Sequence, residues 1–222
     1  MSPDGIAQVL LICWMAALGL LLVRMLFLGL HRSHLLFAVS CGIDLVFGIA
    51  ILKIGIASAA AGALGLLGDT MDVFLTPSIA AEFYGPPGTF EGNATRQLTP
   101  LIFTLIAGIG IILFLVSGPD RDTFQSASAL AFIADTLVTL FVISYVIRRS
   151  RQMDSPVDRN SLWLRRLFAV ELIAGALRSV IGLFFASPKI GILDILFFAV
   201  CLIATFVCMF ALRKPVETTT NP

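Results

Sequence analysis

Residues 99–117 read TPLIFTLIAGIGIILFLVS, a run without a single charged side chain. At 1.5 Å per residue, a helix of this length spans about 30 Å, the thickness of the hydrocarbon core of a bilayer. Comparable apolar runs occupy residues 6–30, 35–57, 124–147, 163–186 and 189–213. The sequence therefore predicts an all-α, polytopic transmembrane helix bundle.

The composition agrees with this interpretation. Hydrophobic residues make up 58% of the 222 residues and charged residues only 13%, and the mean hydropathy is +0.98, far from the balance of a soluble domain. The net charge is +1, and the basic clusters lie between apolar runs, where they act as topology signals. A nucleic-acid partner, which requires a basic surface, is therefore not expected.

Residues 56–85 decide between six and seven crossings. This segment is weakly apolar and carries Asp69 and Asp72, each of which costs about 2.5–3.5 kcal/mol near the centre of a membrane helix. The arginine-rich stretch 148–166 is expected in the cytoplasm, because cytoplasmic loops are enriched in Lys and Arg. Only seven crossings also place Arg32 inside, so we favour seven helices with the N-terminus outside and the C-terminus cytoplasmic. Six helices remain the alternative.

One transmembrane domain accounts for nearly the whole chain. It covers residues 1–213, and residues 214–222 form a short polar tail expected in the cytoplasm. The tight turn at 186–190, marked by Ser187 and Pro188, is expected outside. We expect a multi-pass protein of the plasma (inner) membrane.

Ionisable residues inside the apolar runs are the main pointers to function, because a charge in hydrocarbon normally faces a bundle interior or a wet cavity. These candidate polar residues are Asp44, Lys53, Asp135, Glu171, Arg178 and Asp194.

Two interpretations of these residues stay open. In the first, Arg178 is a structural pin, held by Asp135 or Asp194, and its removal costs about 3–5 kcal/mol, as in buried pairs of soluble proteins. In the second, Asp44 and Glu171 are protonatable groups on a transport path. Glu171 and Arg178 lie almost two helical turns apart, on one face of their helix.

No catalytic, metal-binding or cofactor-binding motif is present. Cys13, Cys41, Cys201 and Cys208 lie in apolar runs without a Cys-x-x-Cys pair, and we expect them to be small buried residues. His31 and His34 lie on a connector without further metal ligands, so we expect this pair to face solvent or lipid headgroups.

The expected function is that of a non-enzymatic bundle, either a small transporter-like protein or an accessory subunit of a membrane complex. Its partners are then the lipid bilayer and other membrane subunits or a second copy of the chain. A membrane-embedded enzyme acting on lipids is the alternative, and it would need the residues Arg24, His31, Arg32 and His34 at one interface.

Overall fold

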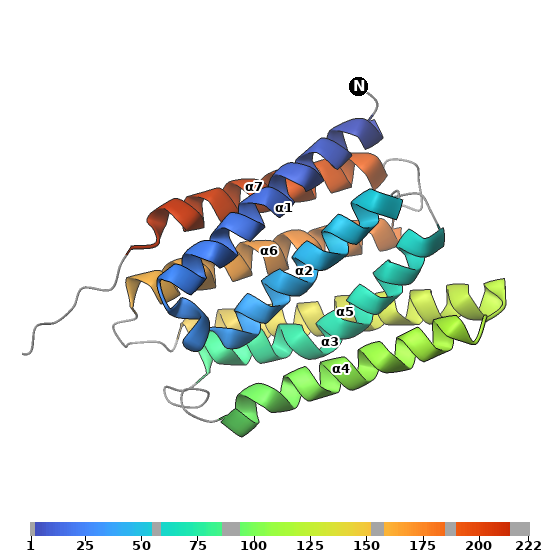
Figure 1. Cartoon of the computed structure of the whole chain (residues 1–222), viewed down its shortest axis with the longest axis horizontal. Helices are drawn as coiled ribbons and strands as arrows, with labels where there is room; N and C mark the ends of the chain where they lie inside the picture. The colour runs from blue at the N-terminus through green and yellow to red at the C-terminus, as the bar shows by residue number, and fades with distance from the viewer. Residues whose placement is uncertain (1–2, 55–58, 86–93, 152–157, 185–189, 214–222) are drawn as a thin grey trace, which may run out of the picture.

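The computed structural model describes residues 3–54, 59–85, 94–151, 158–184 and 190–213. These residues form seven α-helices and one short 3-10 helix (Figure 1). The elements are α1 (Pro3–Phe27), η1 (Leu30–Arg32), α2 (Leu35–Ile54), α3 (Ala59–Tyr84), α4 (Ala94–Val116), α5 (Arg121–Ser150), α6 (Arg159–Phe184) and α7 (Ile190–Ala211). No strand occurs among them, so the all-α prediction is confirmed.

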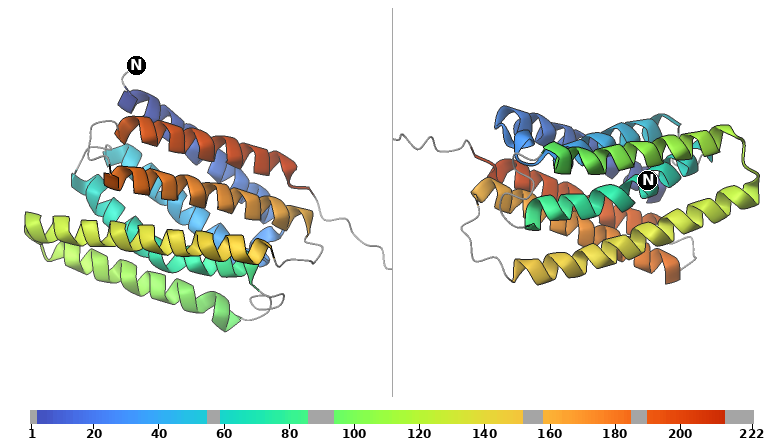
Figure 2. Two further views of the ribbon diagram at one scale, coloured as in Figure 1. Left: turned by 180° about the vertical axis from the view of Figure 1, so that it is seen from behind. Right: turned by 90° about the horizontal axis from the view of Figure 1, so that it is seen from below.

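Successive helices run in opposite directions along one long axis (Figures 1 and 2). Helix α1 packs against α2 and α7, α3 packs against α2, α4 and α5, and α6 lies against α5 and α7. One end of the bundle therefore collects the ends of the odd-numbered helices and the starts of the even-numbered ones. We call it the basic end, because it carries Arg24, Arg32, Arg148, Arg149, Arg151, Arg159, Arg165, Arg166 and Arg213.

The segment that was ambiguous in the sequence is helical throughout. Helix α3 runs without interruption through Pro77, although proline lacks the N–H that would close one helical hydrogen bond. Its neighbours α2, α4 and α5 pack against it on several sides. This packing stabilises the helix, although its own sequence is only weakly apolar and contains a proline. The structure thus contains the seventh helix.

Five of the seven helices are long and apolar enough to cross a membrane: α1, α2, α4, α5 and α7. Helix α3 is less apolar because of Asp69, Asp72 and Glu82, and the described part of α6 holds several charged residues, among them Glu171 and Arg178. These two helices thus carry charged residues within their length.

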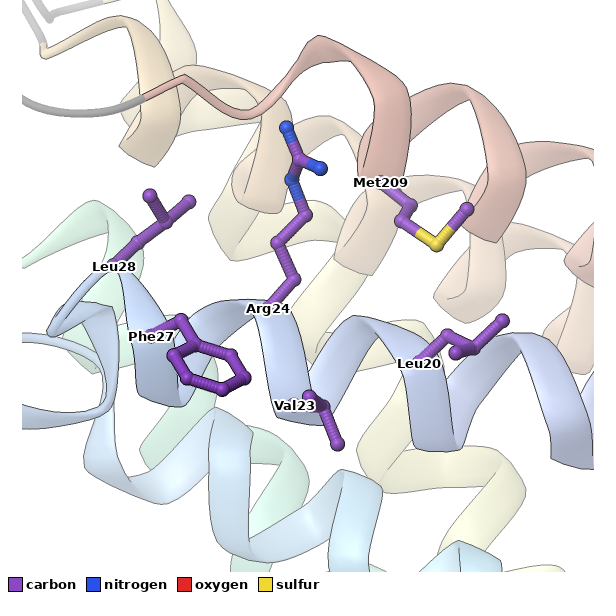
Figure 3. Close-up of a pocket in the computed structure, with 6 residues that line it drawn as sticks. All are labelled: Leu20, Val23, Arg24, Phe27, Leu28 and Met209. Atoms are coloured by element: carbon purple, nitrogen blue, oxygen red, sulfur yellow. The ribbon is translucent and has the colours of Figure 1, made fainter.

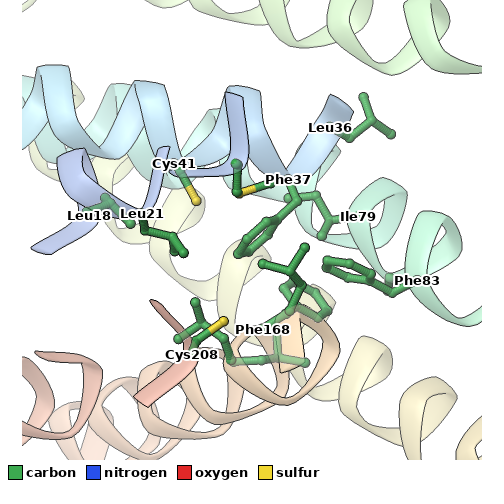
Figure 4. Close-up of a cluster of buried hydrophobic side chains, with 14 of the residues drawn as sticks. Leu18, Leu21, Leu36, Phe37, Cys41, Ile79, Phe83, Phe168 and Cys208 are labelled. Atoms are coloured by element: carbon green, nitrogen blue, oxygen red, sulfur yellow. The ribbon is translucent and has the colours of Figure 1, made fainter. Parts of the chain in front are cut away.

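A cluster of buried side chains joins α1, α2, α3, α6 and α7 towards the basic end (Figure 4). Leu21, Leu36 and Phe83 are completely enclosed there. Cys41 and Cys208 belong to the same cluster as free thiols, and Cys201 is also buried. Cys13 is exposed, so the expectation of four buried cysteines was wrong for this residue, which lies on an outward face of α1.

Several helices extend beyond the predicted apolar runs. Helix α5 begins at Arg121 rather than residue 124, because the Asp120 carboxylate caps it by accepting hydrogen bonds from the backbone N–H (2.9 Å) and hydroxyl (2.7 Å) of Thr123. Hydropathy marks only the apolar part of a helix and misses such polar ends. The predicted turn at 186–190 and the tail at 214–222 lie outside the described residues.

Candidate functional site

A cavity of about 230 Å³ lies between the helices of the bundle, with walls from α1, α2, α3, α5, α6 and α7. Five carboxyl groups line it, and they come from four helices: Asp44, Asp69, Asp72, Asp135 and Glu171. Each is at least nine residues from both ends of its helix, which is about 13 Å along the axis. The carboxyl groups therefore gather in the middle third of the bundle.

Helical periodicity brings these residues to one place. On α6 the lining residues are Phe168, Glu171, Leu172, Gly175, Arg178 and Ser179, which recur every three or four positions and so form one stripe. On α3 they are Asp69, Asp72, Thr76 and Ile79. The polar stripes of α3 and α6 thus face the same space.

Arg178 is the one basic residue among the described side chains that line the cavity. Its Nε donates a hydrogen bond to Oδ1 of Asp194 on α7 at 2.7 Å, which confirms the predicted pairing. The two side chains are 47% and 21% exposed, so the pair is less buried than the pin interpretation assumed. No ion pair joins Arg178 to Asp135 among the described residues.

Glu171 is a cavity carboxylate that is incompletely satisfied. Its Oε1 atom is buried and has no hydrogen-bond partner within the described part of the chain. The indole Nε1 of Trp14, which also lines the cavity, is buried without a partner as well. Because buried polar atoms are nearly always hydrogen-bonded in folded proteins, a water molecule or a bound group is expected beside each of these two atoms.

The candidate polar residues differ in whether they line the cavity. Asp44, Asp135, Glu171 and Arg178 all line the cavity, and Asp194 reaches it through its pair with Arg178. Lys53 is exposed in the last turn of α2 and does not line the cavity.

Sequence reasoning missed Asp69 and Asp72 as part of the site and treated them only as a cost of insertion. The signal was their spacing of three residues, which aligns them with Thr76 on one face.

No group of three or more His, Cys, Asp or Glu side chains in the described ranges is placed to hold a metal ion. The five carboxyl groups thus share a cavity without forming a compact metal cage. They can instead hold protons, or surround a cation larger than a single metal ion.

The basic end holds polar groups of a different kind. Both carboxylate oxygens of Glu82 on α3 accept hydrogen bonds from the first backbone N–H groups of α2, at Leu36 (3.0 Å) and Phe37 (3.1 Å). Asn160 on α6 donates to the carbonyl of Arg213 (2.8 Å) and accepts from its N–H (3.0 Å), which closes the end of α7. These side chains cap the helices of their neighbours.

His34 belongs to this structural network, contrary to the expectation of a solvent- or headgroup-facing pair. It is 6% exposed, and its Nε2 lies 2.9 Å from the Ser161 hydroxyl. Burial, reinforced by the positive charge of Arg165 and partly opposed by Asp158, lowers the pKa of His34 from 6.5 to about 4. The imidazole is therefore neutral at physiological pH.

Arg24 is likewise engaged in structure. It lies in an apolar groove between α1 and α7 (Figure 3), and its Nη2 donates to the carbonyl of Leu212 at 2.5 Å. The four residues that a lipid-modifying enzyme would need therefore do not form an open cluster, since Arg24 and His34 hold helix ends together.

Comparison of the chain with protein-family models, with curated proteins and with solved structures finds no match.

Proposed function

We propose that the chain is an integral membrane protein of the plasma (inner) membrane in which all seven helices cross the bilayer. The alternating helix directions support this (Figure 1), as do the five helices of sufficient length and apolarity. The remaining two, α3 and α6, turn a polar stripe toward the cavity, which is how charged residues are accommodated at membrane depth.

The distribution of basic residues supports an orientation. With the basic end in the cytoplasm, the protein obeys the rule that Lys and Arg are enriched on that side. The opposite end carries Lys53 and Arg121, the latter flanked by Asp120 and Asp122. The N-terminus is then outside and the end of α7 is cytoplasmic.

We further infer that the protein is a small transporter-like bundle that exchanges a cation for protons. The observation that carries this proposal is the cavity at mid-height with five carboxyl groups and a single guanidinium. Ionised carboxylates in such a place need compensating charge, which protons or a cation can supply. When a monovalent cation binds, a carboxylic acid becomes a carboxylate and one proton leaves, so the two are coupled with charge conserved.

Two other roles are less well supported. A lipid-modifying enzyme would need an open cluster of polar residues at the basic end. Arg24 and His34 instead make hydrogen bonds to neighbouring helices. An accessory subunit has no need for carboxyl groups at mid-height, since each is expensive to insert and brings no stability there.

Transport by the purified protein tests the proposal. The full-length chain is reconstituted into liposomes that contain the pH dye pyranine, and Na⁺, K⁺, Ca²⁺ or choline is added outside. Exchange moves the cation inward and protons outward, so the interior becomes alkaline and dye fluorescence rises. We expect at least one cation to give a rise that empty liposomes do not show.

Matched variants locate the path. Asp44→Asn and Glu171→Gln should reduce the initial rate at least tenfold, because each deletes a titratable proton while keeping shape. Asp122→Asn makes the same chemical change on an exposed residue in the first turn of α5 and should leave the rate unchanged. If folded protein gives no cation-driven signal with any of the four cations, the transport proposal is wrong and the accessory role is favoured.

A further inference from the structure

The cavity is aromatic as well as acidic. Rings from five helices form part of its wall: Trp14 (α1), Phe37 (α2), Phe132 (α5), Phe168 (α6) and Phe197 (α7). Figure 4 shows Phe37 and Phe168 projecting from α2 and α6 into the interior of the bundle. A path for a hydrated metal ion gains nothing from such rings, whereas the faces of aromatic rings attract organic cations.

One positively charged side chain of the protein already contacts an aromatic ring of this wall. The guanidinium carbon of Arg178 lies 5.3 Å from the centroid of the Phe197 ring, within the ~6 Å range of a cation–π contact. Trp14 lies against the same ring, edge to face, with the centroids 5.9 Å apart. Phe197 therefore already takes part in a cation–π contact, and it holds Trp14 at the cavity wall.

The size of the cavity fits the same class of ligand. An enclosed apolar space of about 150 Å³ accommodates benzene in another protein, so about 230 Å³ suits a small organic molecule. A bare metal ion would leave most of this volume unfilled, and no set of three ligating side chains in the described residues is arranged around a common point.

Two polar atoms complete the recognition chemistry. The buried Oε1 of Glu171 lacks a hydrogen-bond partner and carries negative charge when ionised, and the buried Nε1 of Trp14 is a donor without an acceptor. A cationic nitrogen would compensate the charge of an ionised Glu171, and a hydroxyl or carbonyl oxygen nearby would accept the hydrogen bond that Trp14 Nε1 can donate.

We propose that the cavity binds a small organic ammonium ion, with its cationic head between Glu171 and the aromatic rings and its oxygen atom toward Trp14. This proposal rests on the proposed function and names the class of its substrate. It predicts that the protein distinguishes an ammonium ion both from metal ions and from a neutral molecule of the same shape.

Binding can be followed through Trp14 itself. The chain has two tryptophans, so in the Trp163→Phe variant the fluorescence of the full-length protein in mild detergent reports on the cavity alone. Choline is titrated as the probe, against its neutral carbon analogue, in which a quaternary carbon replaces the nitrogen. We expect choline to shift the emission saturably and the neutral analogue to bind at least tenfold more weakly.

Substitutions then assign the contacts. In the Trp163→Phe background, Glu171→Gln should weaken choline binding at least tenfold, and Asp44→Asn serves in its place if that variant is not folded. Phe197→Leu should weaken binding about three- to tenfold, because it removes the ring against which Trp14 packs at the cavity wall. Phe206→Leu, on the same helix but exposed and outside the cavity, should bind choline as the parent does.

The alternative outcomes are distinct. Equal binding of choline and its neutral analogue would show an apolar pocket and overturn the proposal. Displacement of choline by Na⁺ or Ca²⁺, with dye signals for these ions alone, would overturn the organic substrate but leave cation exchange in place. Absence of choline binding by folded protein overturns the proposal, whereas absence of transport with every cation overturns the proposed function as well.

Discussion

The basic end of the bundle and the central cavity differ in how completely their polar groups are hydrogen-bonded. At the basic end, Glu82 and Asn160 each make two hydrogen bonds to the backbone of a neighbouring helix. In the cavity, five carboxyl groups and one guanidinium are among the described lining residues, and Glu171 keeps a buried oxygen without a hydrogen-bond partner. Hydrogen-bonded polar groups stabilise a fold, whereas buried polar groups without a partner destabilise it. We therefore assign a structural role to the polar residues of the basic end and a functional role to those of the cavity.

Among the substitutions, the largest expected effect on stability is the loss of the Glu82 cap. Glu82→Gln replaces one accepting oxygen by an amide NH₂, so one buried N–H at the start of α2 loses its partner and faces another donor. We expect the free energy of unfolding in detergent to fall by about 2–3 kcal/mol, since a buried N–H group without an acceptor costs about 1–3 kcal/mol and here it also faces a donor. Thermal unfolding followed by tryptophan fluorescence measures the change.

Glu171→Gln is the matched control for this substitution, because it makes the same chemical change inside the cavity. It should leave stability unchanged or raise it, since a buried carboxyl group with an unpartnered oxygen becomes a neutral amide. A loss of stability at Glu171 as large as that at Glu82 would contradict the distinction between the two regions.

The Asn160 clamp should give the next largest effect. Asn160→Ala removes both hydrogen bonds to Arg213 at the end of α7, and we expect a loss of about 2 kcal/mol, roughly 1 kcal/mol for each bond. Gln125→Ala, which removes an exposed amide in the first turns of α5, is the control and should change stability by less than about 0.5 kcal/mol. Equal melting temperatures for the two variants would show that Asn160 is not a clamp.

Acid should weaken the basic end through His34. The pKa of His34 is lowered to about 4 in the fold, so the unfolded chain takes up the proton first as the pH falls below about 6.5. The contribution of neutral His34 is therefore complete above pH ~6.5 and declines toward pH ~4, by at most about 1.4 kcal/mol per pH unit. The melting temperature of the parent should fall over this range more steeply than that of His34→Gln, and parallel curves would contradict the assignment.

The smallest expected effect is at the Arg178–Asp194 pair. Because the Arg178 side chain is about half exposed, Arg178→Gln should cost about 1 kcal/mol or less. Adding Asp194→Asn should recover most of that loss. A cost of 3–5 kcal/mol for the single variant would restore the interpretation of Arg178 as a buried pin.

The sequence alone determined the class of the fold. Uncharged runs such as 99–117 have the length and periodicity of bilayer-spanning helices, and hydropathy is a local property that needs no tertiary information. The same local reasoning singled out Asp44, Asp135, Glu171 and Arg178, because a charge in an apolar helix is conspicuous whatever surrounds it. The Arg178–Asp194 pair could also be predicted, since Arg178 lies towards the end of α6 and Asp194 towards the start of the next helix, α7.

Only the tertiary structure decided which of these charges share a space. Asp69 and Asp72 count as an insertion cost in the sequence, yet the packing of α3 against α2 and α5 turns them toward Asp44 and Asp135, while Lys53 is left exposed at the end of α2. Likewise, nothing local shows that Glu82 caps α2, because the two partners are 46 positions apart in the chain. The partner of a polar group depends on which helices become neighbours, and that is set by packing over the whole bundle.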